Sequence, residues 1–251
     1  MWTRWIAYLC YAFLYAPIII VVLYSFDESR LAVKWTGFTL KWYEQLLQDG
    51  DLLHAFQNSL VVASVSVAAS ATMGTMAAVG LARMRFAGSG LYRGMTMLPV
   101  IVPEIAMAVS ALTLFVALGV KLSLSTIIVS HIVFCVAYII LVVMGRLQGL
   151  DPRLEEAAQD LGAPPLVAFF KVTLPLLWPG ILSGSLLAFV LSLDDFVITQ
   201  FTAGVGDTTL PLWIYSSVKF GVSPEINALS TIMITLTAGT LVAAEFVRAR
   251  R

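Results

Sequence analysis

The sequence predicts an all-helical integral membrane protein with six transmembrane helices. Of its 251 residues, 59% are hydrophobic and only 12% are charged, whereas a soluble domain carries about 25% charged residues. Six windows have the length and continuous apolarity that a helix needs to cross a bilayer. Together they contain only four of the 15 acidic and 15 basic side chains. This segregation of charge favours membrane spans over a soluble core.

In chain order, the predicted spans are 5–26, 59–82, 95–118, 125–144, 180–201 and 226–247. Apolar runs of this length exclude a transmembrane β-barrel, whose strands are short and alternate in polarity. The first span is expected to stay as an anchor, because its apolar run is longer than a signal-peptide core and lacks a small-residue cleavage site. The chain 1–251 is therefore expected to form a single transmembrane domain.

The basic residues predict the orientation of the spans. With six spans both termini lie on one side, where ten Lys and Arg fall, against five on the other. The positive-inside rule therefore places both termini in the cytoplasm. The clearest signals are a short loop with Arg83, Arg85 and Arg93, and a basic tail at 248–251. A net charge of zero argues against a nucleic-acid partner, so membrane lipid is the expected surrounding.

Small residues recur at every fourth position of the second predicted span, a spacing that allows close helix packing. They are Ser66, Ser70, Gly74, Ala78 and Ala82. Gly180 and Gly184 repeat the spacing in the fifth span. These stripes are interpreted as packing surfaces.

One long cytoplasmic loop, 145–179, is expected to be structured. Asp151 followed by Pro152 is typical of a helix start, with a capping residue before proline at the first helical position. Gly162 is placed to end that helix, and a second helix is expected to begin at Pro165. The loop is too polar to span the membrane and too ordered for a simple tether.

The small residues Ala157 and Ala158 leave a helix face that another protein can approach closely. The loop resembles the EAA loop of permease subunits in ATP-binding-cassette (ABC) importers, with Val172 in place of the usual isoleucine. The residues that carry the resemblance are Glu156, Ala157, Ala158, Gly162, Leu174 and Pro175. In that family the loop is the coupling helix, which rests in a groove of the ATPase subunit. The resemblance implies this role for 156–162.

Four further stretches resemble the polyamine branch of this family, the C-type second permease chain of putrescine and spermidine importers. They are 14–19, 130–135, 191–196 and 221–229. The resemblance implies a type I (MetI-like) importer fold in the bacterial inner membrane. It also implies a second permease chain, two ATP-binding subunits and a periplasmic binding protein as partners. The chain itself would be non-catalytic and bind no cofactor, with ATP and magnesium bound by the ATPases.

The predicted spans hold no Lys or Arg but four acidic residues, of which Glu245, near the cytoplasmic end of its span, is interpreted as topological. The other three, Glu104, Asp194 and Asp195, lie deeper. A charge at bilayer depth is costly, which makes these residues functional candidates. At about 1.5 Å per residue, Glu104 is expected about 14 Å and Asp194 about 21 Å from the cytoplasmic side. Our hypothesis is that Glu104 and one of the aspartates face the path of an extended polyammonium. The alternative is a structural role as protonated or subunit-bridging carboxylates.

Other functions are weaker interpretations of the sequence. Gly204-Val205-Gly206-Asp207 matches the GxGD string of intramembrane aspartyl proteases, but Asp207 is expected in an external loop. No G-x-x-x-x-G-K-[ST] phosphate loop is present, so ATP must be bound by another chain. A permease for another small solute and a secondary cation transporter remain as alternatives. His131, in the fourth span, is interpreted as a hydrogen-bonding bridge between helices.

Overall fold

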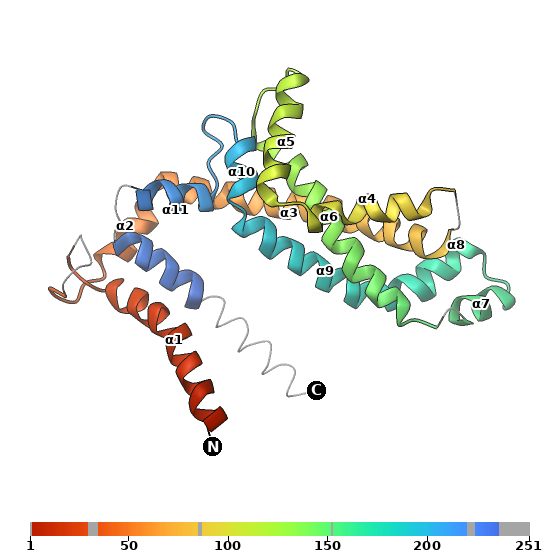
Figure 1. Ribbon diagram of the computed structural model, residues 1–251, viewed down its shortest axis with the longest axis horizontal. Coiled ribbons are helices and arrows are strands. Elements are labelled where there is room, and N and C mark those ends of the chain that lie inside the picture. Colours follow the sequence, from red (N-terminus) through yellow and green to blue (C-terminus); the bar gives the residue numbers. More distant parts are fainter. Residues whose placement is uncertain (1, 30–34, 85–86, 152, 220–223, 236–251) are drawn as a thin grey trace. The chain divides into compact units, whose positions relative to one another are not determined.

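The computed structural model (Figure 1) describes residues 2–29, 35–84, 87–151, 153–219 and 224–235. These described residues form helices and no strand, with one isolated bridge between Asp27 and Phe38. The all-helical prediction is therefore confirmed for them. The chain divides into two compact units, Met1–His54 with Trp213–Arg251, and Ala55–Leu212. The single transmembrane domain stays a prediction.

Five segments of the described chain match the predicted spans in length and apolarity. Four are helices that are long enough to cross a membrane, and a fifth is a bent helix pair. The helical segments concerned are α1 (Trp2–Tyr24), α3 (Gly50–Arg83), α6 (Leu124–Gln148), Pro165–Asp194 and the pair formed by α4 (Ser89–Ile101) and α5 (Glu104–Ala117). The predicted sixth span is helical over 224–235, and its remainder, with Glu245 and the basic tail, lies outside the described residues. Arg85 of the first cytoplasmic loop also lies outside them.

In the first unit, the chain after α1 folds back on the end of that helix. The carboxylate of Asp27 accepts a hydrogen bond from the backbone N–H of Thr36 at 2.8 Å. The backbone carbonyl of Asp27 accepts a second hydrogen bond, from the Trp42 indole N–H, at 2.7 Å. Trp42 lies in α2 (Lys41–Gln48), a short amphipathic helix whose apolar side is buried. The segment that follows α1 is therefore ordered by polar contacts of Asp27.

The third predicted span, 95–118, is a broken helix in the structure. The chain bends by 108° between α4 and α5. Val102 is extended (ψ 135°), and Pro103 next to it has no N–H to continue the helical hydrogen bonds. Glu104 then starts α5. The break thus lies directly beside the acidic residue.

The fifth span also differs from its predicted bounds of 180–201. Helical structure begins at Pro165, with α8 (Pro165–Ala168) and one π-helical segment, η1 (Phe169–Thr173), before α9 (Leu174–Asp194). It stops at Asp194 because Asp195 is extended (ψ 122°), and α10 (Val197–Thr202) follows as a separate helix. The predicted start of a helix at Pro165 is confirmed. This helix continues through η1 into α9 without an interruption.

The second unit is built around α6 and α9, which lie side by side (Figure 1). The small-residue stripe of α3 packs on α6, where Ser66 Oγ donates to the carbonyl of Ile128 at 3.1 Å. A Cβ at Gly74 would come within 2.9 Å of Ile139. On α9, a Cβ at Gly180 would meet the Arg146 side chain at 2.8 Å. Both stripes therefore serve as packing surfaces inside this unit.

Candidate functional site

The predicted coupling helix is α7 (Arg153–Asp160), and its ends are set as the sequence indicates. Asp151 Oδ1 accepts the backbone N–H of Arg153 at 3.0 Å, which caps the first turn. Gly162 adopts a left-handed conformation (φ +89°), and its N–H donates to the carbonyl of Gln159 at 2.8 Å. Because this conformation is unfavourable for residues with a Cβ, glycine terminates the helix here.

The residues of α7 divide between an exposed face and a face that contacts the rest of the unit. Glu156 and Ala157 are exposed, whereas Ala158 is half-buried. Leu161, just beyond the helix, is 91% exposed, although it is a large apolar residue. Nothing in the sequence singles out Leu161, because the exposure of a leucine depends on the tertiary structure. Together Glu156, Ala157 and Leu161 form an uncovered surface, called the α7 face below.

Leu174 and Pro175, the last residues of the motif, do not belong to the α7 face. They form the first turn of α9, where proline needs no hydrogen-bond partner for its nitrogen. Leu174 is half-buried against the core, and Pro175 is exposed. These two residues mark the point where the loop becomes the fifth span. Their proposed part in coupling therefore concerns the span behind α7.

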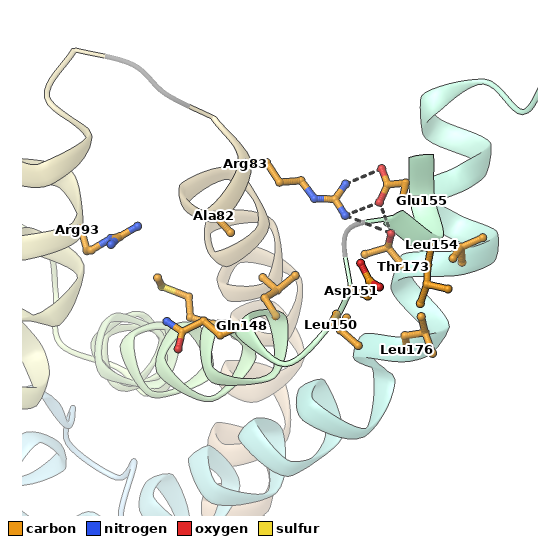
Figure 2. Close-up of a pocket in the computed structure, with 13 residues that line it drawn as sticks. Ala82, Arg83, Arg93, Gln148, Leu150, Asp151, Leu154, Glu155, Thr173 and Leu176 are labelled. Atoms are coloured by element: carbon orange, nitrogen blue, oxygen red, sulfur yellow. Dashed lines mark hydrogen bonds and ion pairs between the residues drawn. The ribbon is translucent and has the colours of Figure 1, made fainter. Parts of the chain in front are cut away.

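The buried side of α7 is attached through Glu155 (Figure 2). The two guanidinium nitrogens of Arg83, at the end of α3, donate to the two carboxylate oxygens of Glu155, one of them at 2.7 Å. Thr173 Oγ1, in η1, donates to the same carboxylate and accepts from Arg83 at 3.1 Å. Burial by itself would raise the pKa of Glu155, but these hydrogen bonds and the Arg83 charge outweigh it and lower that pKa. Glu155 is therefore ionised at neutral pH.

The intramembrane acids lie where the two broken spans meet. The helices α5 and α10 pack against each other, and the carboxyl groups of Glu104 and Asp195 come within hydrogen-bonding reach. Asp194 is close enough to Glu104 for their charges to interact. Glu104 lies in the first turn of α5 and Asp195 just before α10, positions at which the helix dipole favours a carboxylate. The fold thus brings all three predicted acids together.

The two aspartates have different surroundings. Asp195 is 5% exposed, and its Oδ2 accepts both the backbone N–H and the hydroxyl of Thr199 at 2.8 Å. The same oxygen lies 3.2 Å from Nε2 of His131, whose Nδ1 is 2.7 Å from Ser192 Oγ. His131 therefore joins α6 to the end of α9 and to α10, as predicted for a helix-bridging residue. Asp195 has its polar partners inside the chain.

Glu104 and Asp194, in contrast, are exposed at the surface of this chain. Glu104 borders a cavity of about 210 Å³ that is also lined by Pro99 of α4, Tyr138 of α6 and Leu191 of α9. Apolar side chains beside one carboxylate suit a cation with a methylene chain, because the chain can contact apolar carbon while the ammonium pairs with oxygen. Whether any of the three acids touches a substrate remains a hypothesis.

Residues 70–249 match the family described as binding-protein-dependent transport system inner membrane component. The chain belongs to this family of inner-membrane transport proteins. It is 45% identical over 240 residues to the putrescine transport system permease protein PotI of Escherichia coli strain K12, covering 93% of this chain and 85% of that protein. It is 43% identical over 237 residues to the spermidine/putrescine transport system permease protein PotC of the same strain, covering 94% and 90%.

Solved structures share the fold at lower sequence identity. A bacterial ABC transporter for the acidic polysaccharide alginate contains a chain that aligns with a TM-score of 0.72 and 15% identity, covering 98% of this chain and 94% of that one. A chain of the MetNI methionine ABC transporter aligns with a TM-score of 0.60 and 19% identity, covering 84% and 99%. The predicted MetI-like importer fold is thereby confirmed, while these two neighbours say nothing of the solute.

Proposed function

We propose that this chain is a permease subunit of an ATP-driven importer of polyamines, with putrescine or spermidine as the solute. It forms half of a translocation path together with a second permease chain. Two cytoplasmic ATP-binding subunits supply the energy, and a periplasmic binding protein delivers the polyamine. Both termini lie in the cytoplasm. The proposal is carried by α7, which exposes the α7 face on one side and is attached to the rest of the unit through Glu155 on the other. It is supported by the 43–45% identity of the chain to polyamine permeases.

The mechanism follows from how α7 is connected. The helix lies between the end of α6 and the start of α8, so a partner that pushes on the α7 face moves both attached spans. ATP and magnesium are bound by the ATPases, and this chain contributes only the mechanical contact. Movement of α6 and α9 changes the surroundings of the cavity at Glu104, because Tyr138 of α6 and Leu191 of α9 line it. Alternating access of that cavity is the proposed transport step.

Gly162→Val is expected to abolish copurification of the ATPase and uptake of polyamine. Valine at φ +89° costs about 1–3 kcal/mol, and the chain relieves this strain by reorienting the end of α7. Glu156→Ala is expected to weaken the same contact. The measurement is affinity purification of the tagged permease, coexpressed with its ATPase and second permease. Radiolabelled putrescine uptake is measured in parallel.

Gly80→Val serves as the matched control, since a Cβ at Gly80 meets nothing within 4 Å. It should leave complex and uptake intact. Full assembly and uptake in Gly162→Val would contradict a coupling role for α7. Uptake that continues without any ATPase would instead indicate a secondary cation transporter.

Glu104→Gln is expected to reduce polyamine uptake about tenfold or more, while the complex still assembles. The amide loses a charge-assisted hydrogen bond to an ammonium group, a contact worth about 1.5–3 kcal/mol. Asp194→Asn tests the second exposed acid in the same way. The measurement is the initial uptake rate of putrescine and of spermidine at several concentrations. Full uptake in both variants would exclude these acids from the substrate path.

A further inference from the structure

Three segments that are far apart in sequence meet at one carboxylate on the cytoplasmic side. Glu155 of α7 receives Arg83 from the end of α3 and Thr173 from η1 (Figure 2). Arg83 also donates to Thr173, so each of the three side chains contacts both others. We call Arg83, Glu155 and Thr173 the α3–α7 clamp. It joins α3 to the coupling helix although the two are not adjacent along the chain.

The geometry of the clamp requires an arginine. Its planar guanidinium presents two N–H groups to the two oxygens of Glu155, while one of the same nitrogens reaches Thr173. The guanidinium carbon also lies 5.8 Å from the ring centroid of Phe169, within cation–π range. A lysine, with a single point charge, cannot make the paired contact. The clamp therefore fixes the orientation of α7 relative to the end of α3 as well as the distance between them.

The position of Thr173 links the clamp to the fifth span. Thr173 is the last residue of η1 and is buried, and α9 starts at the next residue. A π-helical turn is uncommon and is found mostly at functional positions. Through Thr173 and Glu155, Arg83 therefore contacts both ends of the connection between α7 and α9. Any displacement of α7 acts on Arg83 at once.

The clamp is only partly buried, since the Arg83 side chain is 38% exposed and the Glu155 side chain 16% exposed. Ion pairs that keep contact with water contribute little to folding. The paired hydrogen bonds between Arg83 and Glu155 restrict the motion of α3 relative to α7. This restriction depends on the geometry of the contact and not on its contribution to the free energy of folding. Variants of the clamp should therefore fold and assemble.

We propose that Arg83 is a positioning residue for energy coupling, holding α3 and α7 together so that ATP-driven movement of α7 is transmitted to α3. The helices α6, α8 and α9 follow α7 through the chain itself, whereas α3 follows only through side-chain contacts. This inference rests on the proposed function, since it assumes that an ATPase moves α7. It adds α3 to the membrane helices that move with α7, which are α6 and α9.

The test uses the complete transporter in proteoliposomes and measures solute imported per ATP hydrolysed. Arg83→Gln and Glu155→Gln are each expected to lower this ratio roughly two- to thirtyfold, the range for mutations along a coupling network. Copurification of the ATPase should persist. The double variant should resemble the single variants, because removing one partner already opens the clamp. Arg83→Lys should give an intermediate ratio.

Arg93→Gln is the matched control. Arg93 and the clamp residues line one pocket of about 360 Å³ (Figure 2), but the Arg93 guanidinium donates to the Leu81 carbonyl at 3.3 Å and not to a carboxylate. It should keep the wild-type ratio. An unchanged ratio in Arg83→Gln, additive losses in the double variant, or an equal loss in Arg93→Gln would each overturn the proposal.

A second measurement does not depend on the solute. Spin labels at the exposed residues Met84 and Gln159 report the distance between the end of α3 and α7. In the wild-type assembly this distance should be the same with and without trapped ATP, whereas in Arg83→Gln it should change. If the wild type imports no polyamine, the proposed function fails, and this distance still decides the role of Arg83. A nucleotide-dependent distance in the wild type would refute the clamp.

Discussion

Replacing Asp195 by alanine is expected to destabilise the Ala55–Leu212 unit by about 1–3 kcal/mol for each buried polar group that loses its hydrogen-bond partner. The variant leaves His131 buried without its carboxylate and removes the oxygen that accepts two hydrogen bonds from Thr199. The start of α10 then also loses its capping group. The expected result is a large drop in the midpoint of thermal unfolding of the purified complex in detergent.

Asp194→Ala is the matched control for this stability measurement. The residue is adjacent and has the same side chain, but it is exposed. Its removal should change the unfolding midpoint little. Asp195→Asn should be intermediate, because the amide oxygen still accepts hydrogen bonds from Thr199. Equal stability of the two alanine variants would show that the contacts of Asp195 do not stabilise the fold.

The second large effect is expected for Gly204→Ala in the turn at 204–207. A Cβ at this position would collide with the carbonyl oxygen of Leu122 and would come within 2.7 Å of Asp207 Oδ2. Since the first obstacle is backbone, it cannot move aside by rotating a side chain. Overpacking of this kind costs about 1–3 kcal/mol. We expect a lower unfolding midpoint and a lower yield of assembled complex.

Gly94→Ala provides the comparison, because a Cβ at Gly94 in α4 meets nothing within 4 Å. Alanine there should be neutral or slightly stabilising, since it lowers the entropy of the unfolded chain. If both variants unfold at the same temperature, the close approach of Gly204 to Leu122 does not exist in the assembled protein.

Gly204 also explains the string that resembles a protease motif. The N–H of Asp207 donates to the carbonyl of Gly204 at 3.2 Å, and Gly206 has φ +92°. The glycines are therefore accounted for by a tight turn and a close backbone approach. Asp207 lies in this turn, and the described hydrogen bonds and ion pairs of Asp195 are with His131, Ile198 and Thr199. In the sequence, the string at 204–207 can be explained as a protease motif or as a turn, and the backbone geometry favours the turn.

The break in the third span has a visible signal in the sequence. Pro99 and Pro103 precede Glu104, and each interrupts the helical hydrogen bonding. Proline removes one hydrogen bond, but it does not specify the angle between the two helical pieces. The bend of 108° depends on where α5 packs, which is against α10. A window of apolar residues therefore predicts the presence of a span better than its course.

The sequence by itself determined what depends on neighbouring residues. Apolar length predicted helices able to cross the membrane, Asp151 and Gly162 predicted the ends of α7, and the small-residue stripes predicted close packing. These features follow from local backbone chemistry and from the cost of burying polar groups in lipid. The exposed residues of the EAA motif on α7 are likewise consistent with its polar character.

Only the tertiary structure decided which polar groups meet. Asp194 is the last residue of α9 and Asp195 is extended, so the packing of α6 against the end of α9 and against α10 determines that Asp195 is buried beside His131 and that Asp194 is exposed. The contact between Arg83 and Glu155 joins residues 72 positions apart. No periodicity along the chain encodes such a pair, because it forms only when α3, α7 and η1 have packed. The acids beside the cavity and the clamp on the cytoplasmic side are thus products of packing.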